Sequence, residues 1–413
     1  ISVWVKRTEL GVDSEPVSAG GIGRFRFESD DTFSYQFRSG REIITNRKFR
    51  DTASWYHIVA VGDSTQATES NRMKLYVNGV EETSFSFTNY QDQNQASPGW
   101  GKNTLYSLRV GAAASNTRNF NGYIAEMYYI DGQALDQTYF GKFDSDSGIW
   151  IPKKFSGSFG SLDTYLDFSD SSNLGKNSGG TTDLGANNIS AVDQSTDTCT
   201  NNFCTLNPLA NFKYTTNGIT EGGTVFGDNT GGGVGGAFGT MAVTSGKWYW
   251  EVKLAEQNDH YIGISAVDDG DNIYTSTDPQ DINSSAIFAI SAARYEYING
   301  GTKTYGSTDA FTDFHSTGDI IGIALNMDNN TISIYGNGTL QSGVANSSIY
   351  DAADKLVVPF HGTINDEAQY NFGGYSAWTP SSAESDANGY GSFEYAPPSG
   401  YYSLCTKNLA EFG

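Results

Sequence analysis

Short alternating segments between residues 246 and 372 constrain the fold more than any other feature of the sequence. From Trp248 onward, large aromatic or β-branched residues recur at every second position, as a half-buried β-strand requires. Two later segments, residues 318–327 and 331–335, are joined by Asp328-Asn329-Asn330, and Gly336-Asn337-Gly338 follows them. These are turn residues typical of β-hairpins. The stretch therefore predicts antiparallel strands connected by tight turns.

Composition extends this prediction to the rest of the chain. The 413 residues are enough for two or three domains, each with its own core. The chain contains 48 Gly and 9 Pro, and 14% of its residues are aromatic, which favours an all-β protein with many turns. We find no long segment with apolar residues at helical spacing, and no apolar run near the roughly 20 residues needed to cross a bilayer.

The net charge excludes some classes of partner. The formal charge of −22 at pH 7 argues against nucleic acid, whose phosphates require a basic surface. It argues equally against an anionic membrane surface. We therefore expect neither a nucleic-acid partner nor membrane insertion.

The first third of the chain contains a second series of predicted strands, at residues 24–27, 33–37, 55–61, 73–80, 108–111 and 120–130. Its motifs are Trp55-Tyr56-His57, the hairpin Leu75-Tyr76-Val77-Asn78-Gly79, and Phe120-Asn121-Gly122-Tyr123-Ile124-Ala125-Glu126. The series resembles the laminin-G-like, concanavalin A-like jelly roll. We therefore expect a jelly-roll domain at residues 1–143, with its first strand upstream of Ile1.

The second half of the chain resembles the SPRY domain. The motifs that carry this resemblance, in sequence order, are Gly246-Lys247-Trp248-Tyr249-Trp250-Glu251, the short strand at 261–265, the hairpin at 318–338, and Leu356-Val357-Val358-Pro359-Phe360. The resemblance implies a β-sandwich at residues 212–400 that binds other molecules through its loops. We expect residues 401–413 to begin a junction to a further module.

Residues 144–211 are predicted to form a long Gly/Ser/Asn-rich connector between the two sandwiches. The connector contains two apolar islands, Ile149-Trp150-Ile151 and Tyr165-Leu166-Asp167-Phe168, which we expect to dock on the sandwiches. Cys199 and Cys204 lie five residues apart in the same stretch. Either a disulfide between them or free thiols would fit this spacing, so the redox compartment stays open.

A narrower resemblance covers most of the chain. It rests on Ile1-Ser2-Val3-Trp4-Val5-Lys6-Arg7, Ser147-Gly148-Ile149-Trp150-Ile151-Pro152-Lys153-Lys154, Tyr165-Leu166-Asp167-Phe168-Ser169-Asp170 and Leu404-Cys405-Thr406-Lys407-Asn408-Leu409. These runs look like long, often fibre-like structural proteins of marine bacteriophages, which join a concanavalin A-like module to a SPRY module. The resemblance implies a location on the virion surface, outside the cell, and other virion proteins as partners. It also implies a homo-oligomer, which would be a trimer in a fibre.

Enzymatic activity is not predicted. Jelly-roll glucanases need two carboxylates that flank the scissile bond, but Glu126-Met127-Tyr128-Tyr129-Ile130-Asp131 breaks the required spacing. The histidines are scattered along the chain, and no Gly-x-Ser-x-Gly elbow follows a strand; they are His57, His260, His315 and His361. We expect His57, within an aromatic strand, to be structural.

Two acidic turns could bind calcium, because carboxylates are hard oxygen ligands suited to this cation. They contain Asp144 and Asp146 in one turn, and Asp268, Asp269 and Asp271 in the other. The alternative is that these acids only stabilise solvated turns. Ca²⁺ is therefore a possible cofactor rather than an established one.

Aromatic side chains in loop-like stretches could stack on the apolar faces of sugar rings. The candidates are Tyr90 and Trp100 in the first domain, and Tyr274, Tyr295, Tyr297 and Tyr305 in the second. The alternative for each of them is packing within the protein.

We therefore predict a non-enzymatic virion structural protein of a bacteriophage, of tail or head fibre type, that adheres to host-surface carbohydrate. One alternative is a capsid or tail decoration protein that binds only other virion proteins. Another is a secreted bacterial adhesin or a carbohydrate-binding appendage.

Overall fold

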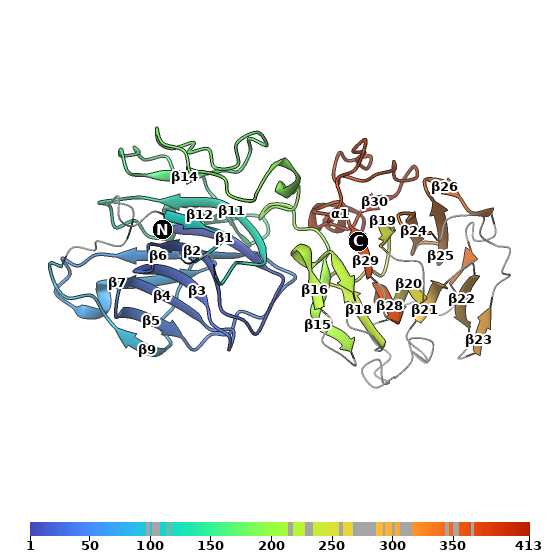
Figure 1. Cartoon of the computed structure of the whole chain (residues 1–413), viewed down its shortest axis with the longest axis horizontal. Coiled ribbons are helices and arrows are strands. Elements are labelled where there is room, and N and C mark those ends of the chain that lie inside the picture. The colour runs from blue at the N-terminus through green and yellow to red at the C-terminus, as the bar shows by residue number, and fades with distance from the viewer. Residues whose placement is uncertain are drawn as a thin grey trace. The chain divides into compact units, whose positions relative to one another are not determined.

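The structure is a computed structural model that describes residues 1–95, 100, 108–113, 115, 117–213, 218–227, 234–255, 259–266, 286–291, 294–299, 302–305, 316–342, 347–349, 355–364 and 367–413. The chain divides into two compact units, Ile1–Gln194 and Ser195–Gly413, which Figure 1 shows. Each unit consists mainly of antiparallel sheets, so the predicted all-β class with two sandwiches is confirmed. The described residues include one α-helix, α1 (Thr406–Phe412), and no helix among them is long and apolar enough to cross a membrane.

The first unit has two six-stranded sheets. Its strands are β1 (Ser2–Arg7), β2 (Ser14–Ala19), β3 (Gly23–Phe27), β4 (Phe33–Arg38), β5 (Arg41–Thr45), β6 (Tyr56–Gly62), β7 (Met73–Val77), β8 (Val80–Glu81), β9 (Phe85–Asn89), β10 (Leu108–Val110), β11 (Gly122–Tyr129), β12 (Gly141–Phe143), β13 (Trp150–Pro152) and β14 (Thr164–Leu166). The β1 sheet has the order β14-β11-β1-β6-β7-β8, and the β3 sheet has the order β10-β2-β3-β4-β5-β9. Short 3-10 turns lie at η1 (Glu69–Asn71), η2 (Gln137–Tyr139) and η3 (Ala191–Asp193).

The core of the first unit lies between these two sheets. Alternate residues of each strand point inward, among them Val3 and Val5 of β1 and Phe25 and Phe27 of β3. Large aromatic side chains fill this space, and Phe27 and Phe33 meet edge to face at 5.1 Å between ring centroids. The aromatic alternation in the sequence therefore encodes a sandwich core.

Residues 135–160 form a further layer over the outer face of the β1 sheet. We call this segment the aromatic cover. Phe140 and Phe155 pack on Tyr128, whose ring stacks on Tyr165 at 4.1 Å. The cover includes the hairpin of β12 and β13. A face that a two-layer sandwich would leave in water is thus buried by rings.

The stretch predicted as a connector divides between the two units. Residues 144–194 belong to the first unit, where β14 pairs with β11 and completes one edge of the β1 sheet, as Figure 1 shows. Residues 195–211 belong to the second unit. The predicted apolar islands around Trp150 and Tyr165 both lie in the first unit, and the side chains of Trp150 and Tyr165 are buried.

The second unit also has two sheets. Its strands are β15 (Leu206–Lys213), β16 (Gly218–Thr220), β17 (Val225–Gly227), β18 (Val234–Gly239), β19 (Lys247–Leu254), β20 (Asp259–Ala266), β21 (Ala286–Ser291), β22 (Arg294–Asn299), β23 (Thr302–Tyr305), β24 (Ile320–Asn326), β25 (Thr331–Gly336), β26 (Thr339–Leu340), β27 (Ser347–Ser348), β28 (Val357–Ile364), β29 (Glu367–Asn371) and β30 (Tyr402–Ser403). The β20 sheet has the order β15-β18-β28-β20-β21-β22-β23. The β19 sheet has the order β16-β17-β29-β19-β24-β25-β26, with β27 beside β25 and β30 beside β19. One 3-10 turn, η4 (Glu221–Gly223), precedes β17.

The alternating segments between residues 246 and 372, which constrain the fold most, form the centre of the second unit. Trp248 and Trp250 of β19 point into its core, and each side chain is almost fully buried. The predicted hairpin is the pair of β24 and β25, and its turn residue Asn330 has a positive φ of 51°. The prediction of strand, turn and strand is confirmed here, because Asn tolerates the left-handed conformation that the turn requires.

Residues 384–413 cover the outer face of the β19 sheet, and we call them the C-terminal cover. Phe393 packs edge to face on Tyr249 at 5.2 Å, and β30 pairs with β19. The Thr406 amide donates to the Asn202 carbonyl at 2.8 Å, and the Cys204 amide donates to the Leu404 carbonyl at 2.9 Å. Residues 401–413, expected to begin a junction, thus pack on the second unit beside its first residues.

Candidate functional site

Trp100 and Tyr90, two of the aromatic residues predicted to bind ligand, lie against the core of the first unit. The Trp100 side chain is 5% exposed, and its ring centroid lies 5.9 Å from that of Phe25. The Tyr129 hydroxyl donates to the Trp100 carbonyl at 2.6 Å. A Cβ on Gly23 would lie 2.4 Å from the Trp100 ring, so the ring occupies the space above this glycine. Tyr90 is half-buried against the same core.

The aromatic and acidic candidates of the second unit are only partly described. Tyr274 lies outside the described residues, as do Asp268, Asp269 and Asp271. Tyr295 and Tyr297 belong to β22 and Tyr305 belongs to β23, where the structure describes the backbone alone. Ligand binding at these positions therefore stays a prediction.

Asp144 and Asp146 lie in the turn between β12 and β13. The Asp144 carboxylate accepts hydrogen bonds from the Ser147 amide at 2.9 Å, the Ser147 hydroxyl at 2.8 Å and the Asp146 amide at 3.2 Å. These donors hold the pKa of Asp144 below its usual value. Across the part of the chain that the structure describes, no group of three or more His, Cys, Asp or Glu side chains could hold a metal ion. The observed donor set fits an Asx-stabilised turn, the alternative weighed from the sequence.

His57 is enclosed by two tryptophans on the outer face of the β1 sheet. Its ring stacks on Trp4 at 4.6 Å and on Trp150 at 6.0 Å. The Trp150 indole Nε1 donates to His57 Nδ1 at 2.8 Å, so the imidazole proton lies on Nε2, 2.8 Å from the Ser2 hydroxyl. Burial lowers the pKa of His57 to about 3. The neutral imidazole therefore fixes Trp150 of the aromatic cover to the sheet, which is a structural role.

The outer face of the β3 sheet carries polar side chains in two rows. Cross-strand pairing aligns the first row, which consists of Arg109, Ser18, Arg24, Gln36, Glu42 and Asn89. The second row consists of Arg26, Ser34, Ile44 and Phe87. These residues point outward because their neighbours along the strands, such as Phe25, Tyr35 and Ile43, fill the core. We call these two rows the polar face.

Ion pairs hold the charged residues of the polar face in place. Ion pairs join Arg24 and Arg26 of these rows, and Arg118 beside them, to four acidic residues. The N···O distances are 3.2 Å for Arg24–Glu42, 3.1 Å for Arg26–Glu28, 3.5 Å for Arg26–Asp13, 3.7 Å for Arg118–Asp13 and 3.5 Å for Arg118–Glu15. Glu15 is almost fully buried, and burial raises its pKa against the opposing effect of the three arginines. Such a network presents guanidinium and carboxylate groups at fixed positions.

A β-bulge turns Phe87 out of the core and onto the polar face. Phe85 opposes Thr45 and packs against the core, whereas Phe87 opposes Ile44, and the register shifts between these two pairs. The extra residue is Ser86, whose hydroxyl lies 3.3 Å from the carbonyls of Ile44 and Thr45. The Phe87 side chain is 48% exposed as a result. Bulges commonly redirect one side chain in this way next to functional sites.

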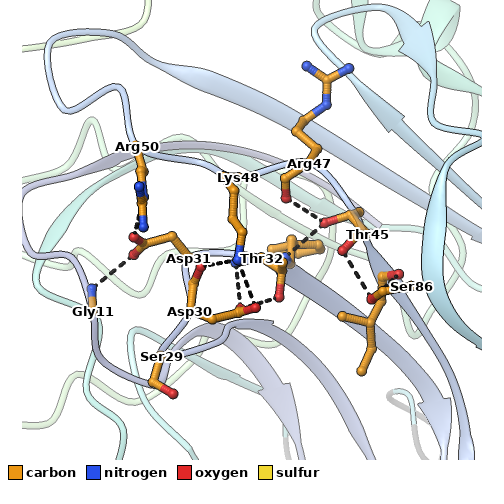
Figure 2. Close-up of polar contacts among 12 residues, drawn as sticks. Gly11, Ser29, Asp30, Asp31, Thr32, Thr45, Arg47, Lys48, Arg50 and Ser86 are labelled. Carbon is orange, nitrogen blue, oxygen red and sulfur yellow. Dashed lines mark hydrogen bonds and ion pairs between the residues drawn. The ribbon is translucent and has the colours of Figure 1, made fainter.

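A cluster of charged and polar residues around Asp31 lies at the end of β5, next to the bulge (Figure 2). Asp31, with a positive φ of 65°, accepts from the Gly11 amide at 2.9 Å and from Arg50 Nε at 2.8 Å. Burial opposes the ionisation of Asp31, but these donors and the nearby Arg7 outweigh it and lower its pKa. The Thr45 hydroxyl donates to the Arg47 carbonyl at 2.9 Å. The strand opposite Phe87 is thus anchored at its end.

The polar face can hold a ligand that has both hydroxyl groups and an apolar surface. Glu42 offers acceptors, Arg24 offers donors and Phe87 offers an exposed ring, while Gln36 is buried. The side-chain amide of Asn89 is held in place, because it donates to the Gly40 carbonyl at 2.6 Å and accepts from Arg41 at 2.7 Å. Sequence reasoning missed this face. The pattern Phe85-Ser86-Phe87 has a period of two, which places both rings on the same side of an unbroken strand. Nothing in the sequence marks Ser86 as the extra residue.

The folds of the two units define the class of protein, an all-β protein built from two β-sandwiches. Residues 1–138 match the family model described as the concanavalin A-like lectin/glucanases superfamily, and residues 247–375 match the SPRY domain. Both domain resemblances expected from the sequence are confirmed. The two matches together indicate a β-sandwich protein that binds carbohydrate or protein.

A solved structure is similar to part of the chain. The crystal structure of the SPRY domain of human HERC1 is 17% identical, with a TM-score of 0.28, and the alignment covers 40% of this chain and 96% of that chain. A comparison with curated protein sequences finds no match.

Proposed function

We propose that this chain is a non-enzymatic structural protein of a bacteriophage particle, of tail or head fibre type, and that it adheres to carbohydrate on the host surface. The observation that carries the binding part of this proposal is the polar face, where the exposed ring of Phe87 lies on the same side of the sheet as the ion pair of Arg24 and Glu42. The match of residues 1–138 to a superfamily that includes lectins supports carbohydrate as the ligand. The phage assignment rests on the sequence runs at residues 1–7, 147–154, 165–170 and 404–409.

The absence of catalysis in this proposal has support from two arrangements. The imidazole of His57 is held between Trp4 and Trp150, so it has no room to approach a substrate. The acidic side chains of the polar face are held in ion pairs with arginines, an arrangement that suits ligand binding.

Binding by such a face would be weak for one copy and strong for many. A virion displays many copies of its surface proteins, so the avidity of several contacts would compensate for a low single-site affinity. We propose a homo-oligomer, trimeric in a fibre, with other virion proteins and a host glycan as partners, outside the cell. The net charge of −22 supports the proposal that neither nucleic acid nor membrane is a partner.

Two measurements test this function. The full chain, multimerised on a carrier, is screened against a glycan array, and we expect reproducible binding to a restricted set of glycans. A cryo-electron map of the native particle should place the first unit with its polar face open to solvent. An array without hits, together with a polar face buried on a neighbouring subunit, would remove the adhesion function.

The second candidate is a capsid or tail decoration protein, and one observation favours it. Three exposed apolar residues surround Trp150: Val80, Phe143 and Ile149, with exposed fractions of 57%, 56% and 63%. The Phe143 ring meets Trp150 edge-on at 4.9 Å, and Gly79, next to Val80, lies directly under the same ring. Exposed apolar groups gathered in this way are typical of protein contacts. A map with another subunit seated on this patch would favour decoration.

A further inference from the structure

We propose that Phe87 is the stacking residue of the polar face and that its ligand is an uncharged sugar ring, whose hydroxyl groups bind to Glu42, Asn89 and Arg24. This inference rests on the proposed carbohydrate-binding function and names the residue and the ligand class. It follows from the bulge, the neighbours of Phe87, the charge balance of the face and one unsatisfied hydroxyl group.

The bulge gives Phe87 an exposure that folding alone does not require. A phenylalanine loses apolar burial when it faces water, which costs free energy in proportion to the exposed area. In a strand without the bulge, Phe87 would share the inner side with Phe85 and would face the core. The structure instead places it outside, with Ser86 tied to the carbonyls of Ile44 and Thr45.

The neighbours of Phe87 match the two kinds of surface on a sugar ring. Ile44 lies directly across from Phe87 and widens the apolar area. Asn89 lies two residues further along β9, roughly 7 Å away at the rise of a strand, and it pairs with Glu42. Glu42 is in turn bonded to Arg24 at 3.2 Å. An apolar strip formed by Phe87 and Ile44 therefore lies beside a row of hydrogen-bond donors and acceptors. A pyranose ring likewise has apolar CH groups on one surface and hydroxyl groups around its edge.

The charge balance selects an uncharged ligand. Arg24 and Arg26 of the polar face, and Arg118 beside it, are already paired with Asp13, Glu15, Glu28 and Glu42. Arg109 of the first row adds a fourth guanidinium group, so four guanidinium groups balance four carboxylates, and a carboxylated or sulfated sugar would have to compete with these carboxylates for the arginines. A polycation would have to displace these arginines. A neutral sugar accepts and donates hydrogen bonds without breaking the ion pairs.

Ser34 provides an independent sign that the face is incomplete without a ligand or a water molecule. Its hydroxyl is fully buried and has no hydrogen-bond partner among the described residues. Ser34 lies in the same row as Phe87, between Arg26 and Ile44. An unsatisfied buried hydroxyl is costly, and a water molecule held under a bound sugar would satisfy it.

The test compares Phe87→Ala with Phe143→Ala in the full chain. Both phenylalanines are about half exposed, but Phe143 lies by the Trp150 patch, on the cover of the other sheet. A glycan array of neutral and acidic glycans identifies the ligand of the unmodified chain, and calorimetry then measures its affinity. We expect the array to select neutral glycans. We expect Phe87→Ala to weaken binding about tenfold or more, since an aromatic contact of this kind contributes roughly 1.4 kcal/mol, and Phe143→Ala to change it less than twofold.

Further variants keep the result interpretable. Phe87→Trp should keep or strengthen binding, because a larger ring preserves the stacking surface, and Glu42→Gln should weaken it while the thermal midpoint stays close to that of the unmodified chain. Glycan binding that survives Phe87→Ala unchanged would overturn the stacking role and leave the carbohydrate function intact. Selective binding of acidic glycans would overturn the ligand class. An array without hits would overturn this inference and the proposed function together.

Discussion

Each of the two units buries the outer face of one sheet beneath a later segment of the chain, but the two covers are held by different chemistry. In the first unit, rings stack on rings, and His57 is the single titratable group between Trp4 and Trp150. In the second unit, a buried carboxyl group holds the cover. Glu251 is fully buried and accepts from the amides of Glu394 and Tyr395, both at 2.8 Å.

The C-terminal cover depends on a second buried carboxylate as well. Asp386 accepts from the Ser403 amide and the Asn408 side chain, both at 2.8 Å, and thereby joins the loop at residue 386 to β30 and α1. The aromatic cover depends on ring packing and one buried imidazole, whereas the C-terminal cover depends on buried carboxyl groups, so the loss of one acceptor leaves several buried donors unsatisfied. The difference predicts that the two units fail under different conditions.

The largest effect is expected from removing the ring that anchors the aromatic cover. Trp150→Ala deletes a buried indole, its stack on His57 and its hydrogen bond to Nδ1, and we expect a loss of about 3–5 kcal/mol in the stability of the first unit. Hydrogen exchange of peptides from residues 135–160 measures this. The exposed neighbour Phe143 is the control, since Phe143→Ala should cost less than about 1 kcal/mol. Equal effects of the two variants would contradict the role of Trp150 as anchor.

The next effect concerns the carboxyl group of the C-terminal cover. Glu251→Ala leaves two backbone amides, the Tyr249 hydroxyl and the Asn371 amide without their acceptor, so we expect a loss of about 2–4 kcal/mol in the second unit. Glu251→Gln keeps one acceptor oxygen and should lose less. Exchange at residues 390–395 is the measurement. A first unit that changes as much as the second would show that the covers are coupled.

The two covers also show how far the sequence could be interpreted. The strands around Trp248 and the Asn330 turn are predictable because period and turn chemistry are local. The covers are not, because Tyr165 and Phe155 have no period, and their burial depends on a face created by distant strands. Glu251 was visible only as one polar residue in an aromatic strand. Its donors lie 143 and 144 residues away in the chain.

The candidate site divides in the same way. Trp100 and Tyr90 were recognisable as aromatic residues outside strands, but whether such a ring packs or projects depends on the space above Gly23, which is a tertiary feature. The polar residues of β3 and β4 follow from alternation. Phe87 does not, because the bulge at Ser86 is set by pairing with β5.

The two covers should respond to pH with opposite signs. Burial lowers the pKa of His57 to about 3, so below about pH 6.5 the unfolded chain binds a proton that the folded unit refuses, and the first unit loses stability as pH falls. Burial raises the pKa of Glu251 to about 7, so its contribution is complete below about pH 4.5 and is lost as pH rises through 7. Burial also lowers the pKa of His361, so the second unit should lose some stability at acid pH as well.

Hydrogen exchange at pH 5 and pH 8 separates these contributions. We expect residues 135–160 to be better protected at pH 8 than at pH 5 once intrinsic exchange rates are corrected. In Glu251→Gln, the alkaline loss at residues 390–395 should disappear, while any acid loss from His361 should remain. If residues 390–395 of Glu251→Gln still lose protection at alkaline pH, another group titrates in the C-terminal cover.

The smallest effect is expected where a carboxylate is exposed instead of buried. Lys48 Nζ donates to Asp30 at 2.8 Å (Figure 2), and this contact, together with two hydrogen bonds from Thr32, lowers the pKa of Asp30 to about 2. Both side chains face water, so Lys48→Ala should change the stability of the first unit by less than about 1 kcal/mol, and salt should reduce the difference further. Thermal unfolding at two ionic strengths measures it. A salt-independent loss as large as that of Glu251→Ala would mean that burial is not what separates these two carboxylates.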